Sequence, residues 1–192
     1  MGYTRAIILG NGESRRGIDI PDDCDVWATN LAFRETMGID YLVSTDVGCQ
    51  HEIYRAGWVK NNPCYFLDWD PMGSDEIDPG IFASTGARVD CNQYTKHGVV
   101  VSGTQDIMYF TYLNEQDNVT NIRLIDLPME LASGQLAMYL AAKSGLYNEI
   151  KLAGFGDEVH LYNDNVPNLE VWEKEREYVI NRFDNIKWRY IQ

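Results

Sequence analysis

The chain has 192 residues, of which 45% are hydrophobic and 23% charged, a composition typical of folded globular proteins rather than disordered ones. Its formal net charge of −13 disfavours sequence-independent binding to nucleic acid and docking on anionic membranes, since both require a basic surface. No apolar run approaches the roughly 20 residues that cross a bilayer, and the first residues do not form a signal sequence, so we expect a cytoplasmic protein.

Short apolar runs alternate with helical patterns along the chain. We predict strands at Ala6–Leu9, Val26–Ala28, Tyr41–Ser44, Cys64–Leu67, Val99–Ser102, Arg123–Leu127 and Ile150–Ala153, and a closing edge strand at Ile186–Ile191. The predicted helices are Val47–Trp58, Thr104–Glu115, Ser133–Leu146 and Leu169–Phe183. Because the strands are apolar without alternation, the pattern indicates a doubly wound α/β fold, with a mostly parallel sheet and helices on both faces.

One segment interrupts this alternation. From Trp69 to Gly98 the chain carries prolines, several glycines and many aspartates. Long stretches of this kind are uncommon in compact domains and are often lids or binding loops. We therefore expect a single domain over residues 1–192, in which residues 69–98 form either a lid or insert, or a plain surface excursion.

The first predicted strand runs into the glycine loop, Gly10-Asn11-Gly12-Glu13-Ser14. Ligands of doubly wound sheets bind at the carboxyl ends of the strands, and glycine lets a backbone approach them closely. We expect a helix to begin near Ser14, where free N–H groups favour an anion and a phosphate would compensate Arg15 and Arg16. The alternative is a tight strand–helix turn with solvated arginines. The loop matches neither G-x-G-x-x-G nor the P-loop pattern.

Two later segments carry similar features. The second predicted strand ends at Asn30, whose side chain suits a base edge or a sugar hydroxyl, or alternatively caps a turn. Ser133 and Gly134 open a predicted helix, with Ser133 as the candidate N-cap, and could face the same crevice. A further strand ends in Gly154-Phe155-Gly156-Asp157. Together these strand ends predict a ligand site.

These segments carry a family resemblance. The stretches "IILGNGESRRGID", "DVWATN" and "ASGQLAMYLAAKSGLYNEIKLAGFGDE" resemble bacterial CMP-sialic-acid-dependent sialyltransferases. They are also similar to the broader 6-hydroxymethylpterin pyrophosphokinase-like (MptE-like) family. The match covers roughly the first 45 residues and then about 130 to 160. It implies a Rossmann-like nucleotide site in which phosphate and ribose are held by Gly10, Asn11, Gly12 and Ser14, and the nucleotide is contacted by Asn30, Ser133 and Gly134.

The resemblance also implies a catalytic group. In the sialyltransferases a histidine before the last helix acts as base on the acceptor hydroxyl, and tyrosines steady the leaving phosphate. The equivalent stretch here, "GDEVHLYNDNVPN", offers His160 and Tyr162. An unperturbed pKa of about 6.5 suits a histidine to this role. Asp157 is the competing base, and a solvated loop histidine is the alternative for His160.

The expected function is therefore that of a glycosyltransferase-like enzyme. It would transfer a sugar from a nucleotide-sugar, with a CMP-sugar favoured, to an unidentified acceptor, and the scheme requires no cofactor. The four cysteines form no C-x-x-C pair, which gives little support for a zinc site. One alternative is an ATP- and Mg²⁺-dependent pyrophosphokinase-like enzyme, whose metal Asp46 and Asp157 would hold. Another is a nucleotide-binding module without catalysis.

Overall fold

The structure is a computed structural model that describes residues 4–36, 38–46, 49–50, 52–53, 56–58, 61–67, 122–125, 131–156, 161 and 169–191. The chain forms two compact units, which are Met1–Val43 with Leu127–Gln192, and Ser44–Asp126. Residues 69–98 lie outside the described residues, so the lid or insert stays a prediction, as does the single domain over 1–192.

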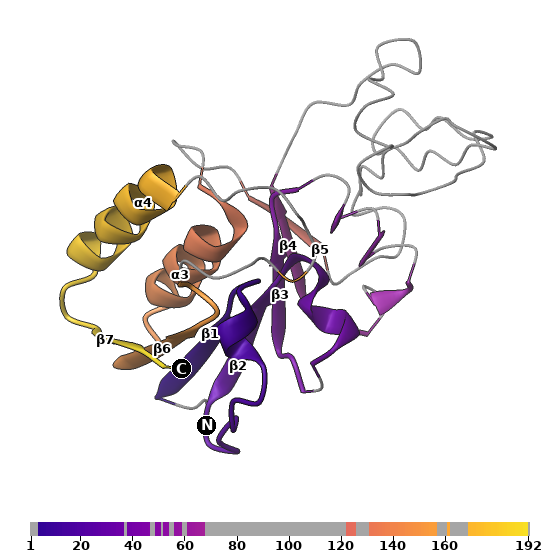
Figure 1. Cartoon of the computed structure of the whole chain (residues 1–192), viewed down its shortest axis with the longest axis horizontal. Coiled ribbons are helices and arrows are strands. Elements are labelled where there is room, and N and C mark those ends of the chain that lie inside the picture. Colours follow the sequence, from indigo (N-terminus) through magenta and orange to yellow (C-terminus); the bar gives the residue numbers. More distant parts are fainter. Residues whose placement is uncertain are drawn as a thin grey trace, which may run out of the picture. The chain divides into compact units, whose positions relative to one another are not determined.

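A parallel sheet forms the centre of the first unit (Figure 1). Its strands run in the spatial order β3-β2-β1-β6-β7. Their bounds are β1 Arg5–Leu9, β2 Asp25–Thr29, β3 Tyr41–Ser44, β6 Glu149–Ala153 and β7 Lys187–Tyr190. Ile8 pairs with Trp27 of β2 on one side and with Leu152 of β6 on the other, and all four strand pairs are parallel. The chain therefore moves outward from β1 to β3 and then continues on the opposite side of β1, as in a doubly wound fold.

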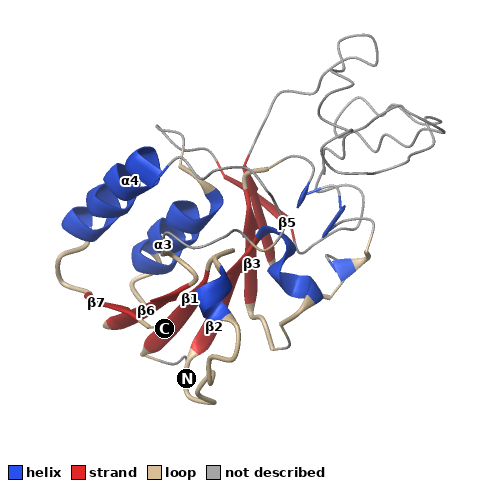
Figure 2. Cartoon of the chain, viewed as in Figure 1, coloured by secondary structure: helices blue, strands red, loops and turns tan. Residues whose placement is uncertain are grey.

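The sheet is covered on both faces. Ile7 and Ile8 are both fully buried, and consecutive residues of a strand point to opposite faces. Helix α3, Ser133–Lys143, packs on β1 and β2, and helix α4, Leu169–Arg182, packs beside α3 (Figure 2). The small side chains Ala137 and Ala141 of α3 are fully buried, which allows the close approach of this helix. The expected α/β fold, Rossmann-like and doubly wound with a mostly parallel sheet, is confirmed.

The described part of the second unit contains a strand pair. Strands β4, Cys64–Leu67, and β5, Ile122–Ile125, are parallel, with Cys64 opposite Ile122. Near the start of this unit Asp46 accepts a hydrogen bond from the amide of Cys49 at 2.8 Å through its carboxylate. This contact is that of an N-cap residue with the first turn of a helix. The geometry thus gives Asp46 a local role in starting that helix.

Several element boundaries differ from the sequence-based expectations. A helix beginning near Ser14 is wrong: β1 is followed by a 3-10 helix, η1, Glu13–Arg15, because Arg16 is already extended. Helix α3 ends at Lys143 rather than Leu146, since Gly145 adopts a φ of 68° and cannot continue it. The edge strand at the end of the chain is confirmed as β7. The predicted elements Val99–Ser102 and Thr104–Glu115 lie outside the described residues.

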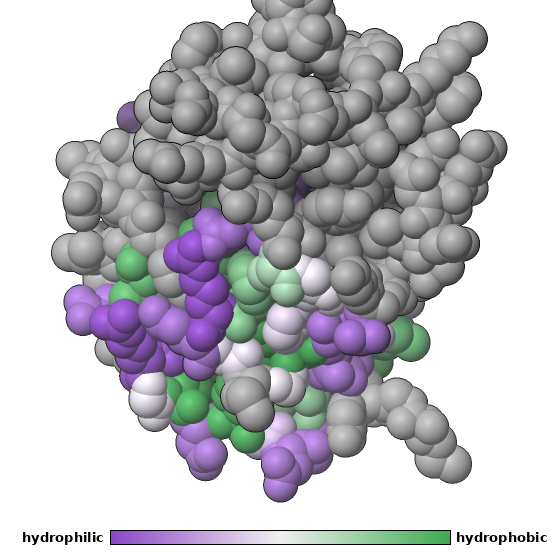
Figure 3. All heavy atoms as spheres, turned by 90° about the vertical axis from the view of Figure 1, so that its right-hand side faces the viewer, coloured by the Kyte–Doolittle hydropathy of each residue, from purple (hydrophilic) through white to green (hydrophobic). Residues whose placement is uncertain are grey.

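The described surface mixes polar and apolar residues. Figure 3 shows the two kinds interleaved over the part of one face that is coloured. Large apolar side chains are exposed at separate places in α4, the sheet edge and the turn after α3, namely Val171, Tyr178, Tyr190 and Leu146. No helix within the described ranges is long and apolar enough to cross a membrane.

Candidate functional site

The sheet has its topological switch point between β1 and β6. The chain leaves β1 toward β2 and leaves β6 toward β7, so the segments that follow these two strands lie at the place where doubly wound folds bind ligands. The glycine loop follows β1, and Gly154 and Phe155 follow β6. The sequence therefore places its two most glycine-rich turns at this crevice.

These two segments are hydrogen-bonded to each other. The amide of Gly10 donates to the carbonyl of Ala153 at 2.8 Å, and the amide of Gly12 donates to the carbonyl of Gly154 at 3.0 Å. The parallel pairing of β1 and β6 thus continues past the strand ends. The amides of Gly10 and Gly12 thus both have protein acceptors, and the role of these residues toward phosphate and ribose stays a prediction.

These turns contain glycine because they leave no space for a Cβ atom. A Cβ on Gly10 would lie 2.4 Å from the carbonyl oxygen of Gly154, a distance at which something must move. Gly154 has a φ of 72°, and its Cβ would lie 2.9 Å from the carbonyl oxygen of Gly12. Glycine at 10 and 154 is therefore required by the close packing of the two backbones after β1 and β6.

The two arginines after the loop are neutralised within the protein. Arg15 is 7% exposed; its guanidinium donates to Thr36 Oγ1 at 3.0 Å and contacts the Glu35 carboxylate at 3.4 Å. Arg16 reaches the other oxygen of Glu35, also at 3.4 Å. The alternative of a turn with solvated arginines does not fit Arg15, which is buried. Glu35 thus provides negative charge to this pair, and Ser14, the last residue of the glycine loop, lies half-buried within η1.

Asn11 is a buried polar side chain at the end of β1, only 8% exposed. The hydroxyl of Thr29, the last residue of β2, lies 3.1 Å from the carbonyl of Leu9 and 3.4 Å from Asn11 Oδ1, and can donate its one hydrogen to either acceptor. The backbone carbonyl of Asn11 accepts from the amide of Leu161 at 2.8 Å. The segment before α4 therefore returns to the glycine loop at Asn11.

Asn30 and Ser133 meet across the sheet. The hydroxyl of Ser133 donates to Asn30 Oδ1 at 2.8 Å. Asn30 has a φ of 49°, the only positive φ of a non-glycine residue in the described part of the chain. Asparagine adopts this conformation more readily than most residues, which fits it to the turn that leaves β2. The expected contact of both residues with one crevice agrees with this geometry, although their roles toward a ligand stay predictions.

The start of α3 differs from the expected serine cap. The N-cap residue is Ala132, and the Ser133 hydroxyl is directed to Asn30 instead of the helix amides. The amide of Ala132 donates to a carboxylate oxygen of Glu175 in α4 at 3.0 Å. Burial raises the pKa of Glu175, while the hydrogen bond from Ala132 acts in the opposite direction. A carboxylate from a neighbouring helix thus satisfies part of this N-terminus.

Gly134 is required by an aromatic neighbour. A Cβ at this position would lie 2.9 Å from Cε1 of Phe155, so the aromatic ring packs directly on the first turn of α3. The carbonyl of Phe155 accepts a hydrogen bond from the guanidinium of Arg176 in α4. Phe155 is largely buried, and it joins the turn after β6 to the start of α3.

Three predicted residues lie outside the described ranges. These are Asp157, His160 and Tyr162, so their roles as bases and phosphate contact stay predictions. The described residues contain no group of three or more His, Cys, Asp or Glu side chains that could hold a metal ion. Sequence reasoning missed Glu175 and Arg176, because charged residues on a polar helix face look alike until packing shows which reach other backbone groups.

The strand order and the covered sheet place the chain among Rossmann-like α/β proteins. It shares this fold with the solved structure of the sialyltransferase CstII from Campylobacter jejuni in complex with a substrate analogue, CMP-3FNeuAc. The TM-score is 0.51 and the identity 16%, over 98% of this chain and 81% of that one. No protein-family model matches the chain, and no curated protein matches it. The likeness supports the sialyltransferase-like part of the expectation and gives no support to the MptE-like part.

Proposed function

We propose that the chain is a glycosyltransferase-like enzyme that takes a sugar from a nucleotide-sugar, with a CMP-sugar as the favoured donor. The observation that carries the proposal is the 2.8 Å contact between Ser133 and Asn30, which joins two segments of the family resemblance at one crevice. The fold shared with a solved sialyltransferase supports the same interpretation.

Asn11 and Asn30 are the side chains that we assign to the donor. The carbonyl oxygen of each asparagine accepts from a protein hydroxyl, Thr29 for Asn11 and Ser133 for Asn30. These contacts orient the amides, so that their N–H groups are the parts suited to acceptor oxygens of a phosphate, a ribose or a base. Gly10 acts here by leaving room for the packed loops, since its own amide is hydrogen-bonded within the protein.

The chemical step is the replacement of CMP by an acceptor hydroxyl. The acceptor oxygen forms a bond to the anomeric carbon, while the bond from that carbon to the phosphate oxygen breaks and CMP leaves with its electron pair. The acceptor proton passes to a base, which we assign to His160 with Asp157 as the competitor. Tyr162 would donate to the leaving phosphate, where positioned donors stabilise growing negative charge. These three roles are supported by the family resemblance alone.

The first test is of nucleotide binding. The protein is titrated with CMP, CDP and ATP, and the backbone amide spectrum and the melting temperature are recorded. We expect CMP to shift the signals of Asn11, Glu13 and Asn30 and to raise the melting temperature. Ligand at 100 times its dissociation constant should add about 2.7 kcal/mol of stability. If no nucleotide shifts these signals, the proposal is wrong and the fold assignment alone stands.

The second test is of turnover. We expect release of CMP from CMP-sialic acid, and a much lower rate in His160→Asn or Asp157→Asn, whichever carries the base. Removal of a general base typically lowers the rate by about 10²–10⁴-fold. Turnover of ATP that depends on Mg²⁺ would instead favour the pyrophosphokinase-like alternative. Binding of CMP without turnover, with a range of acceptors, would favour a non-catalytic module.

A further inference from the structure

Two consecutive residues of α4 hold the backbones of two different loops at the crevice. Glu175 accepts from the amide of Ala132, at the start of α3, at 3.0 Å. Arg176 donates to the carbonyl of Phe155, in the turn after β6. Both side chains are partly buried, whereas their neighbour Glu177 is exposed. One short stretch of α4 thus contacts both the start of α3 and the turn after β6.

The charges of the two residues match the groups that they hold. The start of a helix carries partial positive charge and unpaired N–H groups, which favour the carboxylate of Glu175. A carbonyl at the end of a strand accepts from the guanidinium of Arg176, and hydrogen bonds to charged groups are stronger than neutral ones. Interchange of the two residues would place a cation at the helix N-terminus and a carboxylate at a carbonyl. The pairing is therefore specific to this arrangement.

The two contacts act on the same small region. Ala132 immediately precedes Ser133, which binds Asn30. Phe155 immediately follows Gly154, which accepts from Gly12 of the glycine loop. The ring of Phe155 also packs on Gly134, so a movement of either loop is passed to the other.

Further contacts fix α4 against α3. The side-chain amide of Gln135 donates to the carbonyl of Trp172 at 3.1 Å. Val179 is fully buried, and the rings of Tyr139 and Phe183 meet edge to face with centroids 5.6 Å apart. Helix α4 is therefore held firmly enough to position the groups at its middle.

We propose that Glu175 and Arg176 are positioning residues that set the spacing of the two loops and thereby the affinity for the nucleotide. The effect on affinity rests on the proposed function, whereas the effect on the loops does not. Neither residue is assigned to the ligand or to the reacting atoms.

The experiment uses Glu175→Met and Arg176→Met, which keep much of the aliphatic packing and remove the polar contact. Glu175→Gln and Arg176→Lys retain an acceptor and a donor, and serve as rescue variants. Glu177→Met and Arg182→Met are matched controls, because both residues are exposed on the same helix. For each full-length variant we measure amide hydrogen exchange, melting temperature and the dissociation constant for CMP.

We expect faster exchange in the first turn of α3 for Glu175→Met and at Phe155 and Gly156 for Arg176→Met, with the centre of the sheet unchanged. The dissociation constant for CMP should rise about three- to tenfold in both. The rescue and control variants should stay close to the wild type. A general loss of stability would speed exchange throughout the chain. Faster exchange in one loop only, which returns to the wild-type rate in the rescue variant, therefore indicates a local positioning role.

The outcomes separate the two proposals. If the wild type does not bind CMP, the proposed function fails, and the exchange rates alone decide whether the two residues position the loops. Unchanged exchange in both methionine variants overturns the positioning role. Faster exchange with an unchanged CMP dissociation constant overturns the link to affinity. If a methionine variant does not fold, the glutamine and lysine variants decide, because they keep an acceptor and a donor. Loop exchange and affinity close to those of Glu177→Met then support the proposal, and values well outside that range contradict it.

Discussion

The hydroxyl of Ser133 donates a hydrogen bond to Oδ1 of Asn30 at 2.8 Å, although the two residues are 103 positions apart in the chain. One follows β2 and the other opens α3, so the contact ties a strand end to a helix start. Because Asn30 also holds a positive φ, both its backbone and its side chain are fixed in this turn. The arrangement makes the contact a sensitive point for both stability and ligand affinity.

Substitution Ser133→Ala should weaken the fold and nucleotide binding by similar free energies. It removes the donor to Asn30 and releases the orientation of that amide. We expect a loss of about 1 kcal/mol in stability and a rise of about fivefold in the dissociation constant for CMP. Thermal denaturation and calorimetry provide the two numbers. Ser144→Ala is the control, since that hydroxyl makes its hydrogen bonds at the end of its own helix, where it donates to the carbonyl of Ala141 and accepts from the amide of Leu146; equal affinities in the two variants would contradict the prediction.

Substitution Gly10→Ala should destabilise the chain strongly. The added Cβ would lie 2.4 Å from the carbonyl of Gly154, and two hydrogen-bonded backbones would have to separate. The control is Gly38→Ala, which has a φ of 73° but open space around its Cβ. We expect about 1–2 kcal/mol for the control from backbone strain alone, and a clearly larger loss for Gly10→Ala in chemical denaturation. A Gly10→Ala variant as stable as the control would show that the close approach is not real.

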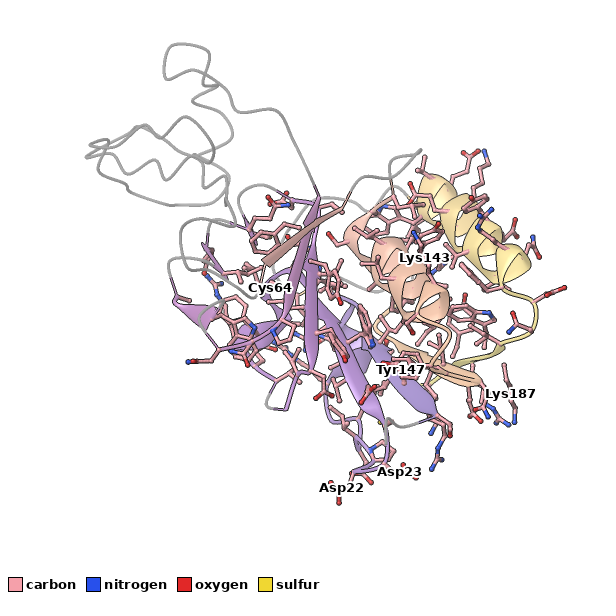
Figure 4. The ribbon with its side chains drawn as sticks, turned by 180° about the vertical axis from the view of Figure 1, so that it is seen from behind. Asp22, Asp23, Cys64, Lys143, Tyr147 and Lys187 are labelled. Atoms are coloured by element: carbon pink, nitrogen blue, oxygen red, sulfur yellow. The ribbon has the colours of Figure 1, made fainter. Side chains whose placement is uncertain are left out.

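The environment of Tyr147 predicts that the protein loses stability at alkaline pH. Its hydroxyl, in the turn between α3 and β6 (Figure 4), donates to Asp25 at 2.6 Å and accepts from Trp27 Nε1 at 3.2 Å. Burial, helped by the hydrogen bond to Asp25, raises the pKa of Tyr147 far above its usual value. The stabilising effect is thus complete below the unfolded pKa of about 10 and is lost as pH rises further.

Tyr147→Phe should therefore cost about 1–3 kcal/mol at neutral pH, because it leaves the buried indole N–H of Trp27 without its acceptor. The difference between the two proteins should shrink as the pH is raised toward about 11. Urea denaturation across this range measures both effects. The prediction fails if the difference stays constant or grows, and Tyr178→Phe, on the exposed side of α4, serves as the control.

Substitution of Glu175, unlike that of Tyr147, should not reduce stability at neutral pH. Burial raises its pKa, so its contribution to stability is complete below the unfolded value of about 4.3 and is lost as pH rises through the folded pKa. Glu175→Gln keeps an acceptor for Ala132 and removes the buried charge. We expect the variant to match or exceed the wild type at pH 7, with the gap closing near pH 4. Lower stability than Glu177→Gln at neutral pH would indicate that the charge at the helix N-terminus outweighs burial.

The sequence predicts the strands of this protein well because each is a short unbroken apolar run. Tyr41–Ser44 and Cys64–Leu67 are confirmed at both ends, and β1, β2 and β6 extend the predicted runs by one or two residues. Two helix boundaries that depend on the backbone conformation of single residues are not predicted. Gly145 ends α3, and the extended conformation of Arg16 prevents a helix after the glycine loop.

Part of the candidate site is also visible in the sequence. Glycine followed by polar residues after a buried strand predicts the loop at the end of β1, and the residues singled out at two other element ends, Asn30 and Ser133, are brought into contact. The sequence does not predict that the amides of Gly10 and Gly12 donate hydrogen bonds to carbonyls at the end of β6 and just after it. Nor does it predict that Glu35 pairs with both Arg15 and Arg16, because that pairing depends on how the chain returns after β2.

The amino-acid sequence by itself determined which segments become strands and helices, since burial periodicity and glycine positions are local properties. Only the tertiary structure decided the order of the strands, with β1 between β2 and β6, and hence which loops meet. The contacts Ser133–Asn30, Glu175–Ala132 and Arg176–Phe155 join residues far apart in the chain. Such contacts depend on the packing of whole elements, and no local pattern of residues encodes them.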